Sequence, residues 1–267
     1  YNSDGSKEYI ADNEAILYET SEGYKFIYDS INGYVLYDYI GNETSITLPE
    51  YINGKIYKIN LPNSLNVNKI IIPETVLSIP NDFSNMIYLK EVVIQEGVTS
   101  IYPTTFYGCS SLERVVIPEG VTSIGSSAFR GCSSLDNISL PDSLSYIADD
   151  AFYDTGFYKQ ESNWIDGFLF IDNYLADIKG VEIGKELILP PNITLTNNKI
   201  LGNINLLLYL ECSGSFYSNH INELPIDNLI TIVFNDDLKS TIKYSETLKN
   251  IVLKKGADLH NNNHFSN

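Results

Sequence analysis

The stretch LERVVIPEGVTSIGSSAFRGCSS, residues 112–134, nearly copies the stretch that precedes it. That preceding stretch, LKEVVIQEGVTSIYPTTFYGCSS, fills residues 89–111, and a looser copy, LDNISLPDSLSYIADDAFYDTGF, fills residues 135–157. Self-similarity at a fixed period of 23 residues indicates a solenoid of stacked coils. A single unit of this kind cannot bury its own apolar side, whereas stacked units share one continuous core.

Each unit begins with a short segment in which alternate residues are apolar, as Val115 and Ile117 are in the middle copy. This alternation predicts an extended strand with one face on the core. Pro118 ends the strand because proline cannot donate a hydrogen bond to a ladder. A second short apolar element follows at residues 121–124, and then a tight turn whose Phe129 fills the interior of the coil.

The strand pattern recurs well beyond the three copies. Successive pairs start 19–24 residues apart, except for one gap of 49 with room for an extra coil around WIDGFLFIDNYLADI, residues 164–178. Parallel strands in adjacent coils would lie ~4.8 Å apart. The apolar pairs are Ile46/Leu48, Ile70/Ile72, Val92/Ile94, Val115/Ile117, Ile138/Leu140, Leu187/Leu189, Leu210/Cys212, Ile232/Phe234 and Ile251/Leu253.

The two ends depart from the repeat. Residues 24–40, YKFIYDSINGYVLYDYI, carry two alternating aromatic runs around Asn32-Gly33, which predicts a β-hairpin that caps the first coil. We expect a single domain with five parts along the chain. They are a hairpin cap (1–45), regular repeats of 22–24 residues (46–157), an interrupted coil (158–184), irregular C-terminal repeats (185–256) and a disordered tail (257–267).

The repeat resembles that of BspA-like proteins, the Treponema-type class of leucine-rich repeats. LERVVIPEGVTSIGSSAFRGCSS carries the resemblance, and GYVLYDYIGNETSITLPEYINGKIYKI, residues 33–59, resembles the way such domains begin. The match is close over residues 33–157 and looser to residue 253. The resemblance implies a right-handed leucine-rich-repeat solenoid of the α/β superhelix class, mostly parallel β with short 3₁₀ or helical turns. It also implies an exported or surface protein, bacterial in most cases, that binds host or neighbouring-cell molecules through its concave strand face.

The charge balance excludes several partners. Acidic residues outnumber basic residues 34 to 17, which gives a net charge of −17 over 267 residues. Such a surface repels nucleic acid and anionic lipid. The sequence contains no apolar run near the ~18 residues that span a bilayer. The chain opens YNSDGSKEY without an initiator Met, so we expect a mature secreted or cell-surface protein whose signal peptide has been removed.

The positions of the three cysteines predict that their side chains fill the core and neither bind a metal nor act as nucleophiles. Cys109 and Cys132 occupy a position that holds Met86 one coil earlier and Thr155 one coil later, so the position takes small or medium fillers. Cys212 occupies a core strand position. Buried cysteine commonly behaves as a small hydrophobe, so we expect no metal and no nucleophile here. A disulfide between Cys109 and Cys132 is geometrically possible in adjacent coils.

Histidines and carboxylate pairs give no catalytic pattern. His220, His260 and His264 lie outside the regular coils, and the last two occupy an asparagine-rich tail for which solvation is favoured over nickel or zinc binding. The pairs Asp149-Asp150 and Asp236-Asp237 predict exposed turns, with a weak calcium site as the alternative. The sequence lacks the common hydrolase, zinc-protease and phosphate-loop motifs. We therefore expect no enzyme, no cofactor and no metal.

Two rows of outward-pointing strand residues are the candidate binding site. The rows lie on the predicted concave face and continue into later coils at Ile188, Glu211 and Val233. The apolar row is either a binding strip or the ordinary strand preference of Val and Ile. The site residues are Ile71, Val93, Val116 and Ser139 in one row and Lys69, Glu91, Arg114 and Asn137 in the other.

The cap contains a cluster of tyrosines for which packing is favoured over a carbohydrate-recognition patch. Its members are Tyr24, Tyr28, Tyr34, Tyr37 and Tyr39. The sequence as a whole predicts a monomeric, non-catalytic adhesion module that binds a protein or carbohydrate ligand of host or other origin. It predicts no nucleic-acid partner and no membrane insertion. The alternatives are a structural spacer that displays another domain, and an enzyme with a site near residues 157–184, where the coils are interrupted.

Overall fold

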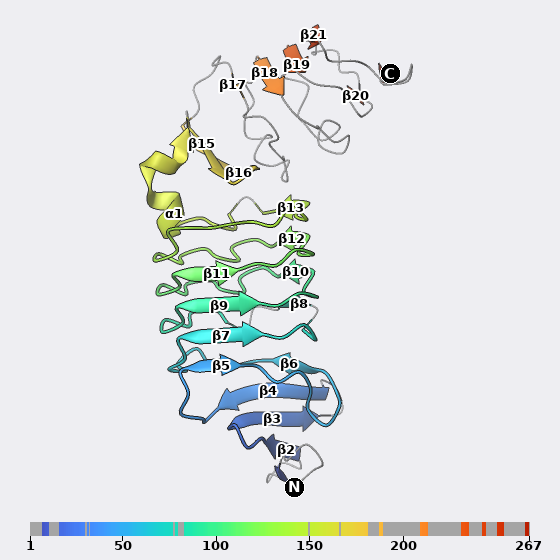
Figure 1. Cartoon of the computed structure of the whole chain (residues 1–267), viewed down its shortest axis with the longest axis vertical. Helices are drawn as coiled ribbons and strands as arrows, with labels where there is room; N and C mark the ends of the chain where they lie inside the picture. Colours follow the sequence, from blue (N-terminus) through green and yellow to red (C-terminus); the bar gives the residue numbers. More distant parts are fainter. Residues whose placement is uncertain are drawn as a thin grey trace. The chain divides into compact units, whose positions relative to one another are not determined.

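The computed structural model describes residues 7–10, 16–29, 31, 33–76, 78–79, 83–148, 150–165 and 167–180. Beyond these it describes the strand segments at 187–188, 209–212, 231–234, 242–243, 250–253 and 265–266. The chain forms two compact units, Tyr1–Gln160 and Glu161–Asn267. In the first unit, parallel strands of successive coils stack above an antiparallel cap (Figure 1). The predicted solenoid of stacked coils is confirmed for this unit.

The cap is an antiparallel sheet to which the first coil adds a parallel strand. The predicted hairpin is confirmed as β3 (Tyr24–Asp29) and β4 (Gly33–Tyr39), and Gly33 has a φ of 72°, which glycine adopts readily. Two further strands, β1 (Lys7–Ile10) and β2 (Ile16–Glu19), extend the sheet on one side. On the other side β6 (Tyr57–Ile59) pairs with β4 in parallel.

The longer strands of the coils form one parallel sheet, which we call the long-strand sheet. It consists of β5 (Ser45–Thr47), β7 (Lys69–Ile72), β9 (Glu91–Ile94) and β11 (Arg114–Val116). The predicted register is confirmed, because Ile46, Ile70, Val92 and Val115 lie side by side and are buried. Alternate residues of each strand therefore face the core and the outside.

A second parallel ladder, the short-strand sheet, joins the coils elsewhere on their circumference. It consists of β8 (Ser78–Ile79), β10 (Ser100–Ile101), β12 (Ser123–Ile124) and β13 (Tyr146–Ile147). The isoleucine of each strand is fully or almost fully buried. The shared core thus lies between the two ladders, and each strand is short because the chain turns within every coil.

A column of phenylalanines runs along the interior. Phe83, Phe106, Phe129 and Phe152 stack with centroid distances of 5.6, 5.3 and 5.3 Å, and their relative exposure is 0–3%. The expectation that the turn phenylalanine fills each coil is therefore confirmed. Stacking of the rings stabilises the folded state in addition to the stabilisation that comes from burying them.

A short helix closes the last regular coil. The helix α1 (Gly156–Lys159) begins at Thr155, whose hydroxyl accepts a hydrogen bond of 3.0 Å from the Tyr158 N–H and donates one of 2.9 Å to the Phe152 carbonyl. Thr155 is fully buried, so these two bonds satisfy its hydroxyl. The filler position of the earlier coils thus becomes a helix N-cap where the repeat ends.

The second unit begins with the 3₁₀ turn η1 (Glu161–Asn163) and an antiparallel sheet. Its strands are β14 (Trp164–Ile165), β15 (Phe168–Ile171) and β16 (Tyr174–Ile178). These residues fill the gap in which an extra coil would fit, but they fold back on themselves instead. A two-residue turn reverses the chain at Asp172, whose φ is 51°.

Four parallel strands follow in the second unit. Strands β17 (Leu187–Ile188), β18 (Tyr209–Cys212), β19 (Thr231–Phe234) and β21 (Asn250–Leu253) align Leu187, Leu210, Ile232 and Ile251, as their spacing predicts. Strand β20 (Ile242–Lys243) pairs with β22 (Phe265–Ser266), so a short strand lies in the stretch expected to be a disordered tail. None of the helices in the described part of the chain has the length and apolar character needed to cross a membrane.

Candidate binding surface

The outward side of the long-strand sheet, which we call the long-strand face, carries the predicted apolar row. Ile71, Val93 and Val116 lie side by side on β7, β9 and β11, and each is half-buried. Their neighbours Ile70 and Val92 are fully buried, which shows the alternation directly. Three β-branched side chains thus form a contiguous apolar strip that solvent reaches.

The predicted charged row runs beside the apolar strip. Glu91 lies between two cations, with its carboxylate 3.2 Å from Lys69 Nζ and in a short ion pair with Arg114 Nη1. The hydrogen bond from Lys69 holds the pKa of Glu91 below its ordinary value; burial opposes this shift and Arg114 reinforces it. Glu91 is therefore ionised at neutral pH, and the three side chains form a fixed polar border to the strip.

Asn137 and Ser139 do not continue these rows in a strand. The predicted strand pair Ile138/Leu140 does not form: the sheet ends at β11, and residues 136–140 have no ladder. Asn137 and Ser139 replace the charged and β-branched residues of the earlier coils, and asparagine in particular is a weak strand former. Four of the eight predicted site residues, Arg114, Val116, Asn137 and Ser139, instead line a groove between β11 and the next coil.

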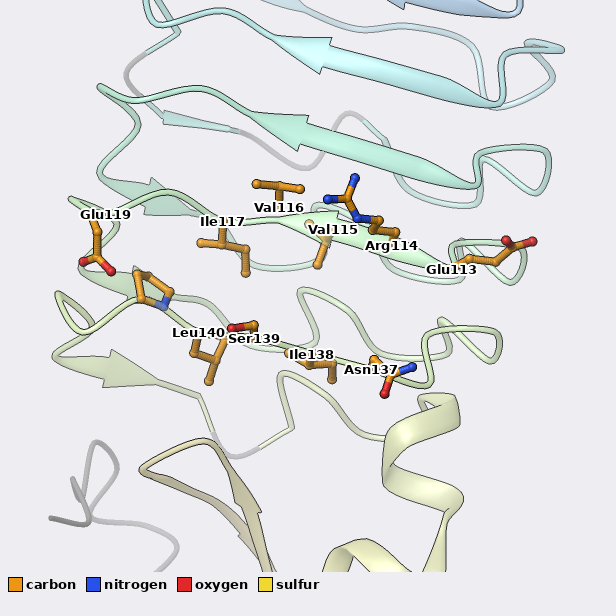
Figure 2. Close-up of a pocket in the computed structure, with 11 residues that line it drawn as sticks. Glu113, Arg114, Val115, Val116, Ile117, Glu119, Asn137, Ile138, Ser139 and Leu140 are labelled. Carbon is orange, nitrogen blue, oxygen red and sulfur yellow. The ribbon is translucent and has the colours of Figure 1, made fainter.

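The groove has a cavity volume of about 550 Å³. Figure 2 shows β11 on one side and the segment from Asn137 to Leu140 on the other, with the side chains of both around the opening. Six of the eleven lining residues are apolar, and the ionisable groups are Glu113, Arg114 and Glu119. This lining suits a polypeptide or another ligand with apolar parts, and it offers no nucleophile with a neighbouring base.

A column of acidic residues borders the coils and was not anticipated from the sequence. The members lie one coil apart and each is exposed. The first four follow the long strand of their coil, and Asp142 follows the equivalent stretch that forms no strand. A second groove of about 500 Å³ lies along the column, lined by Tyr51, Ile56, Glu74 and Glu96 among others. The sequence pattern that predicts this column is an acidic residue at the same position of every repeat. The column consists of Glu50, Glu74, Glu96, Glu119 and Asp142.

Cys109 and Cys132 are core fillers, as predicted. Both are fully buried free thiols, and each donates a hydrogen bond to the carbonyl of a turn phenylalanine one coil earlier. Burial raises the pKa of Cys109 to about 12 and also raises the pKa of Cys132. Thiols of this kind are protonated and inert at neutral pH. The side chain of Cys212 and all of His220, His260 and His264 lie outside the described residues.

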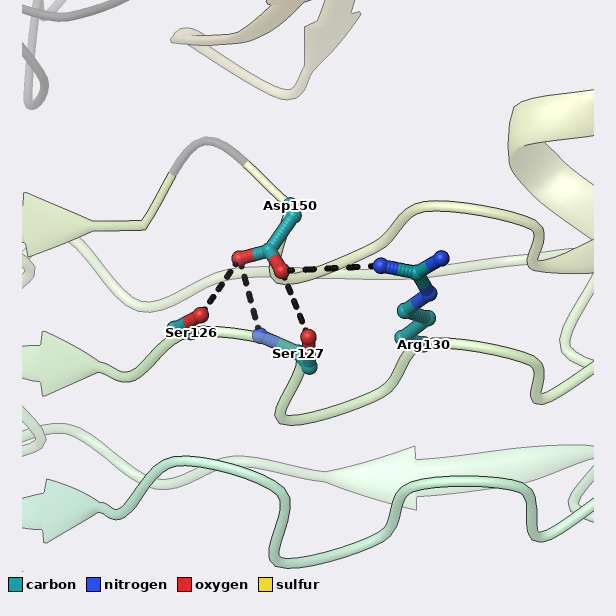
Figure 3. A network of polar contacts seen from close by, with 4 residues as sticks. All are labelled: Ser126, Ser127, Arg130 and Asp150. Carbon is teal, nitrogen blue, oxygen red and sulfur yellow. Dashed lines mark hydrogen bonds and ion pairs between the residues drawn. The ribbon is translucent and has the colours of Figure 1, made fainter.

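Asp150 holds two coils together, which differs from the exposed turn expected for it. Its carboxylate accepts hydrogen bonds of 2.9 Å from the Ser126 hydroxyl and from the Ser127 N–H, and a third from the Ser127 hydroxyl (Figure 3). Arg130 Nη1 lies 4.0 Å from the same carboxylate. Burial raises the pKa of Asp150, but the serine hydrogen bonds outweigh burial and leave that pKa below its ordinary value.

The remaining carboxylates of the predicted pairs, Asp149, Asp236 and Asp237, lie outside the described residues. Within the described ranges, no group of three or more His, Cys, Asp or Glu side chains could hold a metal ion.

Two cap tyrosines belong to the core. Tyr24 and Tyr39 are 5% and 7% exposed and pack with ring centroids 4.9 Å apart, and Tyr24 Oη donates a bond of 2.6 Å to the Thr47 carbonyl. Burial, and after it the neighbouring Tyr39, raises the pKa of Tyr24. Tyr28 is 37% exposed and packs on Tyr34 at 4.9 Å. The packing interpretation therefore holds for Tyr24 and Tyr39, while Tyr28 contributes to the surface.

The stacked parallel coils with a phenylalanine column define a solenoid of the leucine-rich-repeat class. Residues 54–175 match the family model of the BspA type leucine-rich repeat region, in six copies. Over this region the chain is similar to the BspA type leucine-rich repeats, as its sequence predicts. This repeat class indicates a binding or structural module. No curated protein matches the chain.

Several solved structures are similar to the chain at low identity. A leucine-rich cell surface protein from Faecalibacterium prausnitzii shares 18% identity over 95% of this chain and 96% of that chain, with a TM-score of 0.33. The T. pallidum leucine-rich repeat protein shares 17% over 96% and 84%, with a TM-score of 0.32. The pneumococcal vaccine antigen PcpA shares 15% over 92% and 77%, with a TM-score of 0.38.

Proposed function

We propose that this protein is a non-catalytic binding module of an exported bacterial protein, which recognises a protein or glycan ligand through its long-strand face and the loops beside it. The observation that carries the proposal is the half-exposed strip of Ile71, Val93 and Val116, bordered by Lys69-Glu91-Arg114. An exposed contiguous apolar patch on a soluble protein favours a partner. A polar border around an apolar centre is the usual anatomy of an interface.

The same surface gives no support to an enzyme. A catalytic site needs titratable groups that converge in a pocket and orient one another through hydrogen bonds. The groove beside β11 holds Glu113 and Glu119 as its carboxylates, and Arg114 pairs with Glu91 of the neighbouring strand. A curved or flat repeated surface instead supplies a large contact area without chemistry.

Localisation at the cell surface is part of the proposal, and the repeat class supports it. The net charge of −17 favours neutral or basic partners over nucleic acid or anionic lipid.

The test is a biolayer-interferometry screen of the purified protein against mucins, extracellular-matrix proteins and a glycan panel, with and without calcium. A variant that carries Val93→Lys and Val116→Lys is measured beside it. We expect at least one ligand to bind the wild type and to lose about tenfold or more in affinity with the variant, because two charges would enter the apolar centre of the interface.

A matched control carries Tyr102→Lys and Tyr146→Lys. These tyrosines are 47% and 46% exposed on the side of the short-strand sheet. The control should bind as the wild type does. Equal loss in both variants would contradict a site on the long-strand face, and no binding across the panel would favour a structural spacer.

A further inference from the structure

The long-strand ladder stops at β11 although the coils continue. The Arg114 N–H donates to the Lys90 carbonyl at 3.1 Å, so Arg114 is bound to β9. In a parallel ladder successive residues direct their N–H and C=O groups to alternate neighbours. Val115 and Ile117 therefore direct their backbone N–H and C=O groups toward the following coil. In the described stretch 113–141, no backbone hydrogen bond joins these two residues to that coil.

The opening is confined to this side. Around the rest of the circumference the same two coils are joined, because the Ser145 N–H donates to the Thr122 carbonyl at 2.9 Å and the Ala148 N–H donates to the Ile124 carbonyl at 2.9 Å. The Phe129 N–H donates to the Ala151 carbonyl at 2.8 Å. The coil is thus held in place by its neighbours while one strand edge stays unpaired.

Core positions become accessible at the opening. Val115 is 9% exposed, whereas Val92 at the same position of the preceding coil is fully buried. Ile117 is half-buried, although the corresponding Ile94 is 2% exposed, and Ile138 is half-buried, although the corresponding Val92 is fully buried. The groove of about 550 Å³ therefore presents both strand backbone and apolar side chains. Open strand edges are templates for pairing with another chain.

The negative charge at one end of the groove favours a partner with a basic side chain. Glu113 Oε1 lies 3.4 Å from Lys90 Nζ, so this carboxylate already forms an ion pair. Glu119 accepts a 3.2 Å bond from the Asp142 N–H, and among the described residues neither Glu119 nor its neighbours in the acidic column, Glu96 and Asp142, forms an ion pair. A basic side chain beyond the end of β11 would meet this uncompensated charge.

We propose that the groove takes an extended polypeptide segment of a partner protein, which adds as a strand along β11. Its alternate apolar side chains pack on Ile117 and Ile138, and a Lys or Arg reaches Glu119. Main-chain hydrogen bonds supply affinity and side-chain pockets supply selectivity in this mode of recognition. The inference rests on the proposed binding function and names the partner class for one part of the same face.

The probe is the synthetic peptide LKKVVIKKG, a basic version of residues 89–97, because β9 is the natural parallel neighbour of β11. Amide hydrogen exchange of the full chain is followed by NMR as the peptide is titrated. We expect exchange of the Val115 and Ile117 amides to slow by about tenfold or more at saturation, because exchange then requires the bound strand to leave. Unchanged exchange at these two amides would overturn the proposal.

Two further comparisons keep the result specific. The peptide LKKVPIKKG should lose at least about tenfold in affinity, because proline removes an N–H and restricts the strand. Glu119→Gln should weaken binding by about two- to fivefold, the range of an exposed ion pair. Glu96→Gln, in the same column but outside this groove, should weaken binding less than Glu119→Gln does.

The outcomes separate this inference from the proposed function. If a ligand from the panel binds through Val93 and Val116 while the peptide leaves Val115 and Ile117 unprotected, only the strand-addition inference fails. If protection of the two amides rises with protein concentration alone, a second copy occupies the groove and the proposal of a basic partner is overturned.

Discussion

Single side chains link each coil of this solenoid to the next. Phe129 stacks between Phe106 and Phe152, both at 5.3 Å. Asp150 binds the turn of the preceding coil through three hydrogen bonds. In a repeat protein each unit is stabilised by its interfaces with its neighbours, so the loss of one such contact weakens two coils at once.

Phe129→Ala should lower the free energy of unfolding by about 3–5 kcal/mol, the range for truncation of a buried phenylalanine. Urea denaturation followed by circular dichroism measures it. Tyr102→Ala, at a side chain that is 47% exposed, serves as the control and should cost less than about 1 kcal/mol. Equal effects of the two substitutions would mean that the turn phenylalanine is not a core residue.

The Asp150 network predicts a dependence of stability on pH. A carboxyl group whose pKa is lower in the folded protein contributes stability at pH values above its unfolded pKa and loses it as the pH falls through its folded pKa. The ordinary pKa is 3.8, so the loss occurs below that value. Between pH 5 and pH 2.5, the wild type should lose more stability than Asp150→Asn. Parallel pH profiles would show that the three hydrogen bonds do not stabilise the charged carboxylate.

Elements in this chain are short, and the turns between them are tightly constrained. Gly97 and Gly120 occupy the same turn in successive coils, with φ values of 103° and 100°. A Cβ at Gly97 would lie 2.7 Å from the Glu74 carbonyl oxygen, whereas a Cβ at Gly120 would meet nothing within 4 Å. The two positions therefore share the cost of a positive φ and differ in the steric contact.

Gly97→Ala should consequently be more destabilising than Gly120→Ala. The positive φ costs each variant about 1–3 kcal/mol. The contact with Glu74 adds about 1 kcal/mol or more to Gly97→Ala, because backbone atoms would have to move. Differential scanning calorimetry of both variants gives the comparison. A larger effect at Gly120 would contradict the close approach of the two turns.

Most of the regular elements could be predicted because their signals are local. The alternation of Val92/Ile94 and Val115/Ile117 places the strands, and the constant spacing fixes their register. The opening after β11 could not be predicted in this way. Ile138 and Leu140 carry the same alternation, and only the missing backbone contacts between coils show that no ladder forms.

Other features of the structure could not be predicted from the sequence for comparable reasons. Strands β1 and β2 are joined by residues 11–15 without the Asn-Gly pair of a two-residue hairpin, so the cap looked like a simple hairpin. Residues 164–178 are apolar and lie in a gap with room for a coil, but the turn at Asp172 reverses the chain. The equivalence of Asp149-Asp150 with Ser126-Ser127 one coil earlier indicated an exposed turn, but it could not show that Asp150 binds those two serines. The outward strip on the candidate site followed directly from the strand period.

At the scale of the whole molecule, charge opposes compactness. The net charge of −17 and the column of exposed carboxylates repel one another at low ionic strength. Raising NaCl from about 0.01 M to about 0.1 M shortens the screening distance from ~30 Å to ~10 Å. The melting temperature should therefore rise by about 2–4 °C. Calorimetry in the two buffers measures it, and a lower melting temperature in salt would contradict dominant self-repulsion.

The proposed binding surface depends on the division of each long strand into a core side and an outward side. The most direct test is the thermal unfolding of two lysine variants, Val93→Lys with Val116→Lys and Val92→Lys with Val115→Lys. The first pair lies on the half-exposed strip, and the second lies at core positions that are 0% and 9% exposed. We expect the outward variant to melt within a few degrees of the wild type. The inward variant should lose cooperative unfolding, because unpaired charges would enter the core. Equal destabilisation by the two variants would mean that the strip is covered, and it would remove the basis for a binding site on this face.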